Sequence, residues 1–589
     1  MAAWLIILTI GLTWAGALAV WLAGDKRPKL QHAVAVVFSL AAAAAAIALI
    51  PNTTDEVVLS IDAGTAFGVF TFVPNSLGVF LAVIATTIGS LAIIFSVNYM
   101  HGEAQLGRYY AFVLLFIGAM AGLVLSGSMF LLFLFWEITA LCSYALISFH
   151  NDDPKAVAGG VKALIITQLG GIGLLVGALA AYAFLGSYQI DDLLAQADTL
   201  PPNVLTFIAF SFLIAAMAKS AQVPFHTWLP DAMEAPTPIS ALIHAATMVN
   251  AGVYLLARFY PAFEDVAGWK TAVIIVGMVT ALLAAMMAVV AHDLKRVLAY
   301  STVSQLGYMV YAVGVGSVAA SQFHLMSHSI FKALLFLGAG AVIHAVGTRD
   351  MRQMGGLRKT MPVTAVVFSI GAAALAGLPI FNGFWSKELI LEAGLHEGPL
   401  WGYFGMLLGA GITAFYTFRM VSMVFFGKTA EAHPVAHTEI HVHDAGTAMK
   451  AALIPLAIGV CTSWLLVGPF SQWLQATLPY HHLHTATTLE FIIEILSAPA
   501  TYLALAVVAL GLAAWWQRSK LAGLSQPLSG LSRAADNGFG FESLNKGLVS
   551  ITQKSATALQ VTQTGQLNWN VLGIVAGLVA VLLLVFFAG

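Results

Sequence analysis

The stretch that decides the fold is LIAAMAKSAQVPFHTWLPDAMEAPTPISALIHAATM, which runs from Leu213 to Met248. Lys219 lies here inside an apolar run. A charged amine at membrane depth costs about 2.5–3.5 kcal/mol, so it needs a partner or a hydrated cavity. Pro224 follows shortly after it and removes a backbone hydrogen bond that lipid cannot replace. The sequence therefore predicts a broken membrane helix that carries a functional charge.

The composition of the whole chain is that of a polytopic membrane protein. Of its 589 residues, 60% are hydrophobic and 9% are charged, whereas about 25% of residues are charged in soluble domains. This composition excludes a soluble enzyme, and nothing in the sequence suggests nucleic-acid binding. Cys142 and Cys461 both fall in apolar runs, which leaves no disulfide framework and no cysteine-based cluster site.

Apolar runs of about 20 residues, each long enough to cross a hydrocarbon core of about 30 Å, recur along the chain. They predict an all-α polytopic membrane protein with sixteen transmembrane helices. The predicted spans are residues 3–23, 31–50, 77–98, 108–127, 129–149, 161–185, 203–230 (broken), 239–260, 270–291, 296–317, 322–346, 362–391 (broken), 400–427, 450–474, 499–517 and 570–588.

The positions of Lys and Arg predict the orientation of these spans. Of the 25 Lys and Arg residues, nineteen fall in or beside the loops after odd-numbered spans, five lie within spans, and only Lys270 falls on the other side. By the positive-inside rule the odd-numbered loops face the cytoplasm, and an even number of spans places both termini on the outer side. No positive charge precedes the first span and Lys26, Arg27 and Lys29 follow it, so we expect a retained helix rather than a signal peptide.

Polar joints group the predicted spans into blocks, two of which contain five spans each. Both five-span blocks have a Pro-interrupted fourth span, at Pro224 and at Pro379. Because five is odd, two blocks of one fold are inverted relative to each other, and paired broken helices indicate an inverted-repeat transporter. The alternative is that Pro is simply frequent in membrane helices. The predicted parts are N-terminal helices 1–107, a first repeat 108–260, a second repeat 261–430, two helices in 431–517, and a cytoplasmic connecting segment with a short amphipathic helix and a final span in 518–589.

Further ionisable residues lie inside the predicted spans. Glu137 lies in the fifth span, and pairing it with Lys219 would lower the insertion cost of both and let the pair hold or release a proton. The second block carries Lys332 in the eleventh span and Lys387 with Glu388 in the twelfth. These residues are the candidate charges of a transport path.

Histidines extend this set. His324, His328 and Lys332 are spaced at i, i+4 and i+8, so they share one helix face at steps of about 6 Å. Imidazole, with a reference pKa of about 6.5, suits proton relay. His244 is a further candidate near Lys219, although a lone histidine in a bundle is more often a satisfied interhelical hydrogen bond than a relay.

Other polar groups have simpler interpretations. Asp293, Lys295 and Arg296 lie at a cytoplasmic helix end, where a capping cluster explains them as well as function does. Arg419 is expected to snorkel to the inner edge of the membrane. Two loop histidine clusters lack the supporting pattern of a metal site, so we predict no metal there. They are His433, His437, His441 and His443 with Asp444, and His481, His482 and His484.

Several motifs resemble one family. They are KSAQVPFHTWLPDAMEAPTPISALIHAATMVNAGVYLLAR, DLKRVLAYSTVSQLGYM, FHLMSHSIFKALLFLGAGAVIH, MGGLRKTMPV, GFWSKELIL and YTFRMV. Over residues 90–430 the chain resembles the L-type, largest antiporter-like membrane subunit of respiratory complex I, which has relatives in Mrp-type sodium/proton antiporters and membrane-bound hydrogenases. The resemblance implies a fourteen-helix core of two inverted five-helix repeats.

The resemblance also implies proton translocation and assigns its residues. The family's glutamate, broken-helix lysines, histidines and connecting lysine fall on Glu137, Lys219, Lys387, His244, His324, His328 and Lys332, with Glu388 where the family often has Asp. No metal or catalytic centre and no cofactor is expected in this subunit, and NAD(H), FMN, iron–sulfur clusters and quinone are expected only in partner subunits. The expected partners are other membrane subunits, including antiporter-like homologues, in the lipid bilayer of the inner (cytoplasmic) membrane.

Besides Glu388, the chain departs from the family in two further places. Gln168 and Gly171 stand where the L-type subunit usually has Arg and Asp, as in Mrp-type relatives. The family's long lateral helix would have to fit into residues 518–569, which are interrupted by Gly538 and Gly540; even fully helical, this segment spans only ~78 Å. We therefore expect the lateral helix to be shortened or absent, with an amphipathic surface helix over 546–562.

The functional hypothesis is that this subunit moves protons with energy released in a separate redox arm. A change of charge near Glu137 would alter the proton affinity of Lys219, and the proton would pass along the histidine row to Lys387; gating by the broken helices is equally compatible. One rival is a sodium/proton antiporter subunit, which would need an oxygen-rich cation site that the spans do not display. A second rival is a scaffold that transports nothing.

Overall fold

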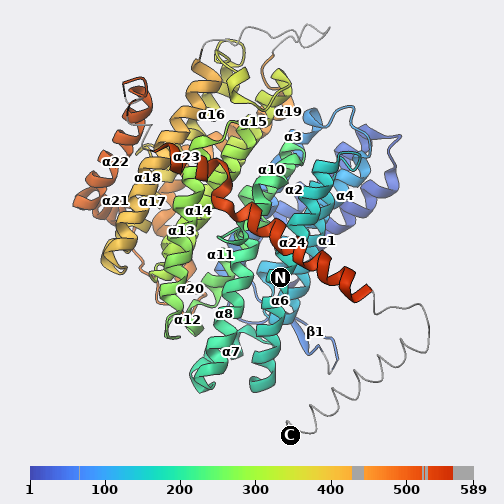
Figure 1. The fold of residues 1–589 in the computed structure, drawn as a ribbon. Helices are drawn as coiled ribbons and strands as arrows, with labels where there is room; N and C mark the ends of the chain where they lie inside the picture. Colours follow the sequence, from blue (N-terminus) through green and yellow to red (C-terminus); the bar gives the residue numbers. More distant parts are fainter. Residues whose placement is uncertain (65–66, 428–442, 521–522, 524–527, 561–589) are drawn as a thin grey trace. The chain divides into compact units, whose positions relative to one another are not determined.

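The computed structural model describes residues 1–64, 67–427, 443–520, 523 and 528–560, and most of them are helical (Figure 1). The first helices are α1 (Ala2–Ala23), α2 (Pro28–Ala48), α3 (Ser76–Tyr99), α4 (Leu106–Leu125), α5 (Met129–Ile147), α6 (Pro154–Leu185), α7 (Ile190–Gln196), α8 (Pro202–Lys219), α9 (Trp228–Asp231), α10 (Thr237–Ala241), α11 (Met248–Arg258) and α12 (Tyr260–Phe263). They are followed by α13 (Trp269–Val290), α14 (Leu294–Gly314), α15 (Val318–Val346), α16 (Pro362–Ala376), α17 (Asn382–His396), α18 (Leu400–Val421), α19 (Thr447–Thr462), α20 (Val467–Ala476), α21 (Thr488–Ser497), α22 (Pro499–Trp516), α23 (Ser529–Asp536) and α24 (Phe541–Gln560).

The chain forms two units, Met1–Leu528 and Ser529–Gly589. In the described residues, thirteen helices are long and apolar enough to cross a membrane, which confirms a polytopic membrane protein. They coincide with predicted spans 1 to 9, 11 and 13 to 15. Predicted span 10 is the helix α14, and predicted span 12 consists of α16 and α17. The last predicted span, 570–588, lies outside the described residues.

Both predicted helix breaks are present. Pro379 lies in the short gap between the end of α16 and the start of α17. The first break begins earlier than expected, because α8 ends at Lys219 itself and Pro224 lies in the irregular segment that follows. The break frees backbone carbonyls, and side chains replace the lost donors: Trp228 Nε1 donates to the carbonyl of Ala218 at 3.0 Å. Protein groups thus satisfy the backbone where lipid could not.

A π-helical turn was not predicted. It spans Leu242–Ala246, labelled η5, and it holds His244 between α10 and α11. Its carbonyls are partly satisfied by side chains, since Thr247 Oγ1 donates to Leu242 O at 2.8 Å and Asn250 Nδ2 donates to Ala245 O at 2.9 Å. Such turns are frequent at functional sites, and this one sets His244 apart from an ordinary helix residue.

A small β-hairpin between α2 and α3 was also missed. Strands β1 (Leu59–Asp62) and β2 (Val69–Phe72) pair antiparallel, with Leu59 opposite Phe72. Gln189 fixes the second strand, because it donates to Val69 O at 2.8 Å and accepts from Thr71 at 2.5 Å. Apart from this hairpin and isolated β-bridges, the regular secondary structure of the described residues is helical.

The two five-span blocks have matching neighbour relations. In the first block α4, α5, α6, α8 and α11 each contact the next helix, and in the second block α13, α14, α15, α16 with α17, and α18 do the same. The division into blocks and their inverted relation stay predictions. The blocks also touch each other, since the backbone N–H of Val223 in the first break donates to Thr280 of α13 at 3.0 Å.

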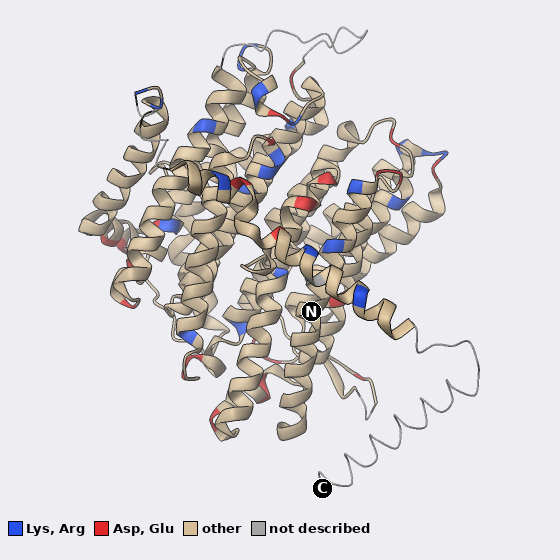
Figure 2. Ribbon diagram, viewed as in Figure 1, with Lys and Arg blue, Asp and Glu red and all other residues tan. Residues whose placement is uncertain are grey.

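The two ends of the helices in Met1–Leu528 differ in the sign of the charged residues that they carry. Figure 2 shows Lys and Arg gathered at the upper helix ends, while the lower ends carry mainly Asp and Glu. This asymmetry is the pattern expected of a membrane protein with its Lys- and Arg-rich loops in the cytoplasm.

The Ser529–Gly589 unit contains α23 and α24 in its described part. The predicted interruption at Gly538 and Gly540 is confirmed, because Phe539 between them has a φ of 51° and ends the helical run. The predicted helix 546–562 is present as part of α24, which begins five residues earlier at Phe541; residues 561 and 562 lie outside the described part of the chain.

The prediction for Arg419 was wrong. Its side chain is buried instead of snorkelling. The guanidinium donates to Ala291 O at 2.7 Å and contacts His292 Nδ1 at 2.8 Å. Arg419 therefore ties the end of α18 to the connection between α13 and α14.

Asp444 has a structural role as a helix cap, which its position in a histidine-rich loop did not suggest. Its carboxylate accepts from the backbone of Val363 at 2.9 Å and of Thr364 at 3.2 Å, and from the Thr364 hydroxyl at 2.6 Å. It thereby caps the first turn of α16, where the helix dipole favours a negative charge. Partial burial opposes ionisation, but these hydrogen bonds outweigh it and hold the pKa of Asp444 below its usual value.

We predict that Asp444→Ala lowers the free energy of unfolding by about 1 kcal/mol, the usual cost of losing a helix cap. Thermal unfolding of the solubilised protein, followed by tryptophan fluorescence, measures the change. Because the folded pKa is depressed, the difference is full above an unfolded pKa of about 3.9 and is lost as pH falls through the folded value. Asp198→Ala, which removes an exposed carboxylate, is the control; an equal midpoint shift in both variants would refute the capping role.

Candidate functional site

Glu137 and Lys219 lie close together in the first block. Lys219, the last residue of α8, is completely buried. Its ammonium donates to the carbonyl of Trp136 on α5 at 2.8 Å and lies 4.9 Å from the centre of the Trp136 ring. Glu137, the next residue on α5, is partly exposed and interacts electrostatically with Lys219. The predicted pair is thus brought together, with the lysine held by a backbone carbonyl.

Gly171 and Gln168 of α6 shape the surroundings of Glu137. A Cβ at position 171 would overlap Oε1 of the glutamate, so the carboxylate occupies the space that any larger residue would need. Gln168 is hydrogen-bonded to the same carboxylate. Gln168 and Gly171, the two residues that depart from the family pattern, therefore have one geometric consequence. The Glu137 carboxylate lies against α6 at a position where α6 carries no charged side chain.

The histidine row of the second block is confirmed on α15. His324, His328 and Lys332 are all buried, and the two imidazole rings lie 6.4 Å apart. His324 is hydrogen-bonded through Nδ1 to Ser386 of α17 at 2.9 Å and through Nε2 to Gln305 of α14 at 3.1 Å. The row therefore links α14, α15 and α17.

The two lysines of the second block are held by backbone and hydroxyl oxygens. Lys332 donates to Leu298 O at 3.2 Å and to the Ser301 hydroxyl. Lys387 donates to Leu375 O, a carbonyl in the last turn of broken α16, at 3.0 Å. Lys332 and Lys387 interact electrostatically with each other, and Glu388 interacts electrostatically with Lys387.

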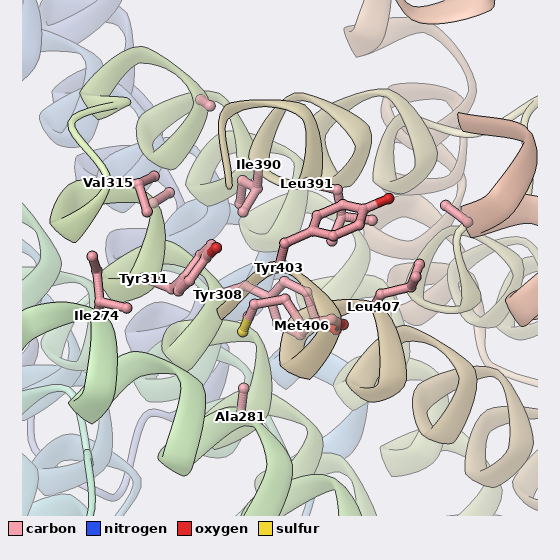
Figure 3. Close-up of a cluster of buried hydrophobic side chains, with 13 residues drawn as sticks. Ile274, Ala281, Tyr308, Tyr311, Val315, Ile390, Leu391, Tyr403, Met406 and Leu407 are labelled. Atoms are coloured by element: carbon pink, nitrogen blue, oxygen red, sulfur yellow. Dashed lines mark hydrogen bonds between the residues drawn. The ribbon is translucent and has the colours of Figure 1, made fainter. Parts of the chain in front are cut away.

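An apolar cluster closes one side of Lys387. Its ammonium lies 5.7 Å from the ring centre of Tyr308. That ring belongs to the cluster shown in Figure 3, where Tyr308, Tyr311 and Tyr403 meet Ile390 and other side chains from α13, α14, α17 and α18. The face of the Tyr308 ring attracts the ammonium weakly, while the apolar side chains of the cluster offer it no hydrogen-bond acceptor.

His244 lies beside the second block rather than only beside Lys219. It interacts electrostatically with Lys332 and His328, and its ring lies 4.7 Å from that of Phe336 on α15. Between Lys219 and this group, buried polar residues bridge the blocks: Asn250 of α11 donates to Ser329 of α15 at 3.4 Å. Sequence reasoning did not single out Asn250 or Ser329, although both are polar residues in apolar spans.

Many polar atoms along this path have no protein partner within the described residues. They include both ring nitrogens of His244 and of His328, Oε1 of Glu137, Oε1 of Gln222, Oδ1 of Asn250 and Nε2 of Gln305. Buried polar atoms in folded proteins are almost always hydrogen-bonded, and water is the usual partner when protein is not. The arrangement therefore suits a hydrated row of groups able to accept and donate protons.

Sequence reasoning also undervalued Lys295. Asp293 does cap α14, because its carboxylate accepts from the backbone of Arg296 at 3.1 Å. Lys295 is buried, however, and its ammonium donates to Ala235 O, in the segment after the first break, at 2.5 Å. Arg349 joins the same region by pairing with Glu234 and with Asp293, each at 3.0 Å. Lys295 and Arg296 differ in burial, since Lys295 is buried and Arg296 is exposed. The sequence alone does not show this difference.

No group of three or more His, Cys, Asp or Glu in the described part of the chain could hold a metal ion. His433, His437 and His441 lie outside that part. Asp444 caps α16, and buried His481 is hydrogen-bonded to Ala257 O at 2.8 Å. These two members of the histidine-rich loops thus have structural partners.

Comparison with known proteins places the chain in a family. Residues 126–413 match the profile "NADH:quinone oxidoreductase/Mrp antiporter, TM", and residues 64–110 match "NADH-Ubiquinone oxidoreductase (complex I), chain 5 N-terminus". The solved Mrp complex from Dietzia sp. DQ12-45-1b contains a similar chain, with a TM-score of 0.81 and 28% identity over 99% of this chain and 63% of the other.

Curated relatives are more similar in sequence. NAD(P)H-quinone oxidoreductase chain 5 of Picosynechococcus sp. is 41% identical over 433 residues, which is 68% of this chain and 65% of that protein, so this chain spans about two thirds of its length. NADH-quinone oxidoreductase subunit L of Mycobacterium tuberculosis is 41% identical over 451 residues, 74% of this chain and 69% of that protein. The chain therefore belongs to the complex I subunit L (chain 5) family of antiporter-like membrane subunits.

Proposed function

We propose that this chain is a proton-translocating membrane subunit of a complex I-type NAD(P)H:quinone oxidoreductase. The observation that carries the proposal is the row of buried ionisable residues from Glu137 and Lys219 through His244, His324, His328 and Lys332 to Lys387 and Glu388. Burying this many ionisable groups in an apolar bundle is costly. The cost is understandable if they move charge.

The geometry supports a transfer in steps. Redistribution of charge near Glu137 changes how strongly Lys219 holds its proton, since the two interact and Lys219 is completely buried. Imidazoles that accept at one nitrogen and donate at the other then connect Lys332 to Lys387. The final transfer to the outer side works against about 2.3 kcal/mol per charge per 100 mV.

The broken helices supply a second element of the mechanism. Lys219 ends α8, and Lys387 donates to a carbonyl freed by the end of α16. A change in the protonation of either lysine therefore alters a contact at or beside a break. Proton movement and small shifts of the breaks are coupled in this proposal, with Pro224 and Pro379 preventing a continuous helix.

The redox chemistry belongs to partner subunits in this proposal. NAD(H), FMN, iron–sulfur clusters and quinone are held there, and this chain contributes no redox or catalytic centre. It lies in the inner (cytoplasmic) membrane among other membrane subunits, including antiporter-like homologues. Sixteen spans, two inverted five-helix repeats and outer-facing termini complete the proposed topology.

An Mrp-type sodium/proton antiporter subunit is the alternative. It is favoured by the structural likeness to the Dietzia Mrp complex and by the uncharged Gln168 and Gly171 on α6. The higher identity to the curated quinone oxidoreductase subunits, 41% against 28%, favours the redox-linked complex. Electron transfer to quinone by the purified complex, without added sodium, separates the two.

Lys219→Met is the first test. Methionine fills the lysine's space without a charge, so we expect proton pumping in sealed vesicles to fall by about tenfold or more, since acid–base groups contribute about 10²- to 10⁴-fold. Pumping is measured with a pH-sensitive dye and divided by the electron-transfer rate in the same vesicles. Lys155→Met, at an exposed position in the first turn of α6, is the control. A normal pumping ratio in Lys219→Met would favour a scaffold.

Gly171→Ala tests the position of Glu137 without changing a charge. The new methyl group would displace the carboxylate, because a Cβ there overlaps Oε1. We expect a several-fold lower pumping ratio in the same vesicle assay, with the complex still assembled. Gly11→Ala is the matched control, since a Cβ at Gly11 meets nothing within 4 Å. Equal pumping by the two variants would show that the exact place of Glu137 is unimportant.

A further inference from the structure

A cavity of about 730 Å³ lies at one end of the second block. It is formed where α13 and α15 begin and where α14 and α17 end, and it is bordered by α20, α21 and the loop between them. These ends belong to loops after even-numbered spans, which the distribution of Lys and Arg assigns to the outer side. The cavity therefore lies on the predicted outer side, and its lining includes both apolar and ionisable side chains.

One face of α17 leads from the buried site to this cavity. Glu388, Glu392 and His396 are spaced at i, i+4 and i+8, so they lie on one side of the helix over about 12 Å. Glu388 is almost fully buried, Glu392 is partly buried and His396 is exposed. Only Glu392 and His396 of the three line the cavity. Ile390 and Leu391 instead join the apolar cluster of Figure 3.

Glu392 stands between two sets of ionisable groups. Toward the interior it interacts electrostatically with Glu388. Toward the cavity it interacts with Glu494 of α21, with His396 and with His484. His484 and Glu494 also approach each other, with Nε2 and Oε2 3.4 Å apart. Glu392 thus interacts both with the buried Glu388 and with the more exposed groups at the cavity.

His481 places a buried imidazole ring in the wall of the cavity. It is 2% exposed, lines the cavity, and is hydrogen-bonded through Nε2 to Ala257 O at 2.8 Å. Burial lowers the pKa of His481 to about 4, so its ring is neutral near pH 7. Since Nε2 donates to the carbonyl, Nδ1 is an acceptor, and it has no protein partner among the described residues.

We propose that Glu392, with His396, Glu494 and His484, forms a proton-release cluster that connects Glu388 to water in this cavity. The step is a proton transfer only. Protonated Glu388 gives its proton through water to the Glu392 carboxylate. Glu392 then passes the proton to the His396, Glu494 and His484 side chains at the cavity and recovers its negative charge. Two carboxylates that repel each other electrostatically disfavour double ionisation, so the arriving proton is shared by the pair before release. This inference rests on the proposed function.

The test uses the complete complex in sealed vesicles. We expect Glu392→Gln to lower the pumping ratio by about tenfold, and Glu392→Asp to restore most of it. Glu397→Gln is the matched control, because Glu397 lines the same cavity at the end of the same helix but lies outside the row. Normal pumping by Glu392→Gln, or an equal loss in Glu397→Gln, would overturn the proposal.

Lys387→Met, assayed beside these variants, separates the two proposals. If Lys387→Met abolishes pumping while Glu392→Gln pumps normally, only the release cluster is wrong. If Lys387→Met also pumps normally, the proposed function itself fails.

Labelling provides a readout that does not depend on pumping. His396→Cys in a Cys461→Ala background should react with a membrane-impermeant maleimide from the outer side of oriented vesicles. Cys142, the remaining cysteine, is buried. Reaction only from the cytoplasmic side would overturn the assignment of the cavity.

Discussion

An ammonium group inside a membrane protein needs hydrogen-bond acceptors from the protein or from enclosed water, because lipid provides none. Three lysines of this chain meet that constraint in the same way. Lys219 donates to a carbonyl of α5, Lys332 to a carbonyl and a hydroxyl of α14, and Lys387 to a carbonyl at the end of α16. These acceptors are neutral, so they hold an ammonium without fixing its charge by a close carboxylate. Groups held in this manner can lose and regain a proton, whereas tightly paired ions resist it.

The surrounding helices bury these three lysines inside the protein. Tyr308 and its apolar neighbours close one side of Lys387, while α15 carries both histidines and Lys332 through the middle of the second block. Ion pairs are concentrated at the helix ends, where Arg349 joins Glu234 to Asp293. Those pairs join the segment after the first break to the ends of α14 and α15, whereas the interior lysines are held by neutral oxygens.

Much of the site was predictable because apolar spans make each ionisable residue conspicuous. Glu137, Lys219, His324, His328, Lys332 and Lys387 stood out from the sequence for that reason, and both breaks followed from Pro224 and Pro379. Residues whose role depends on burial were not predictable. Lys295 and Arg296 are adjacent and chemically alike, yet the first is buried on Ala235 and the second is exposed. The burial of the Arg419 side chain was missed for the same reason. The π turn at His244 was missed because it contains no proline or glycine that would indicate an irregular helix.

The account depends on the row of buried groups being continuously hydrated. High-resolution electron cryomicroscopy of the intact complex, with water density examined between Lys219 and Glu388, tests this directly. The account predicts ordered water at the ring nitrogens of His244 and His328 and beside Asn250, within hydrogen-bond distance of the next polar group in each direction. A dry gap between Lys219 and Lys332, closed by apolar side chains, would contradict it.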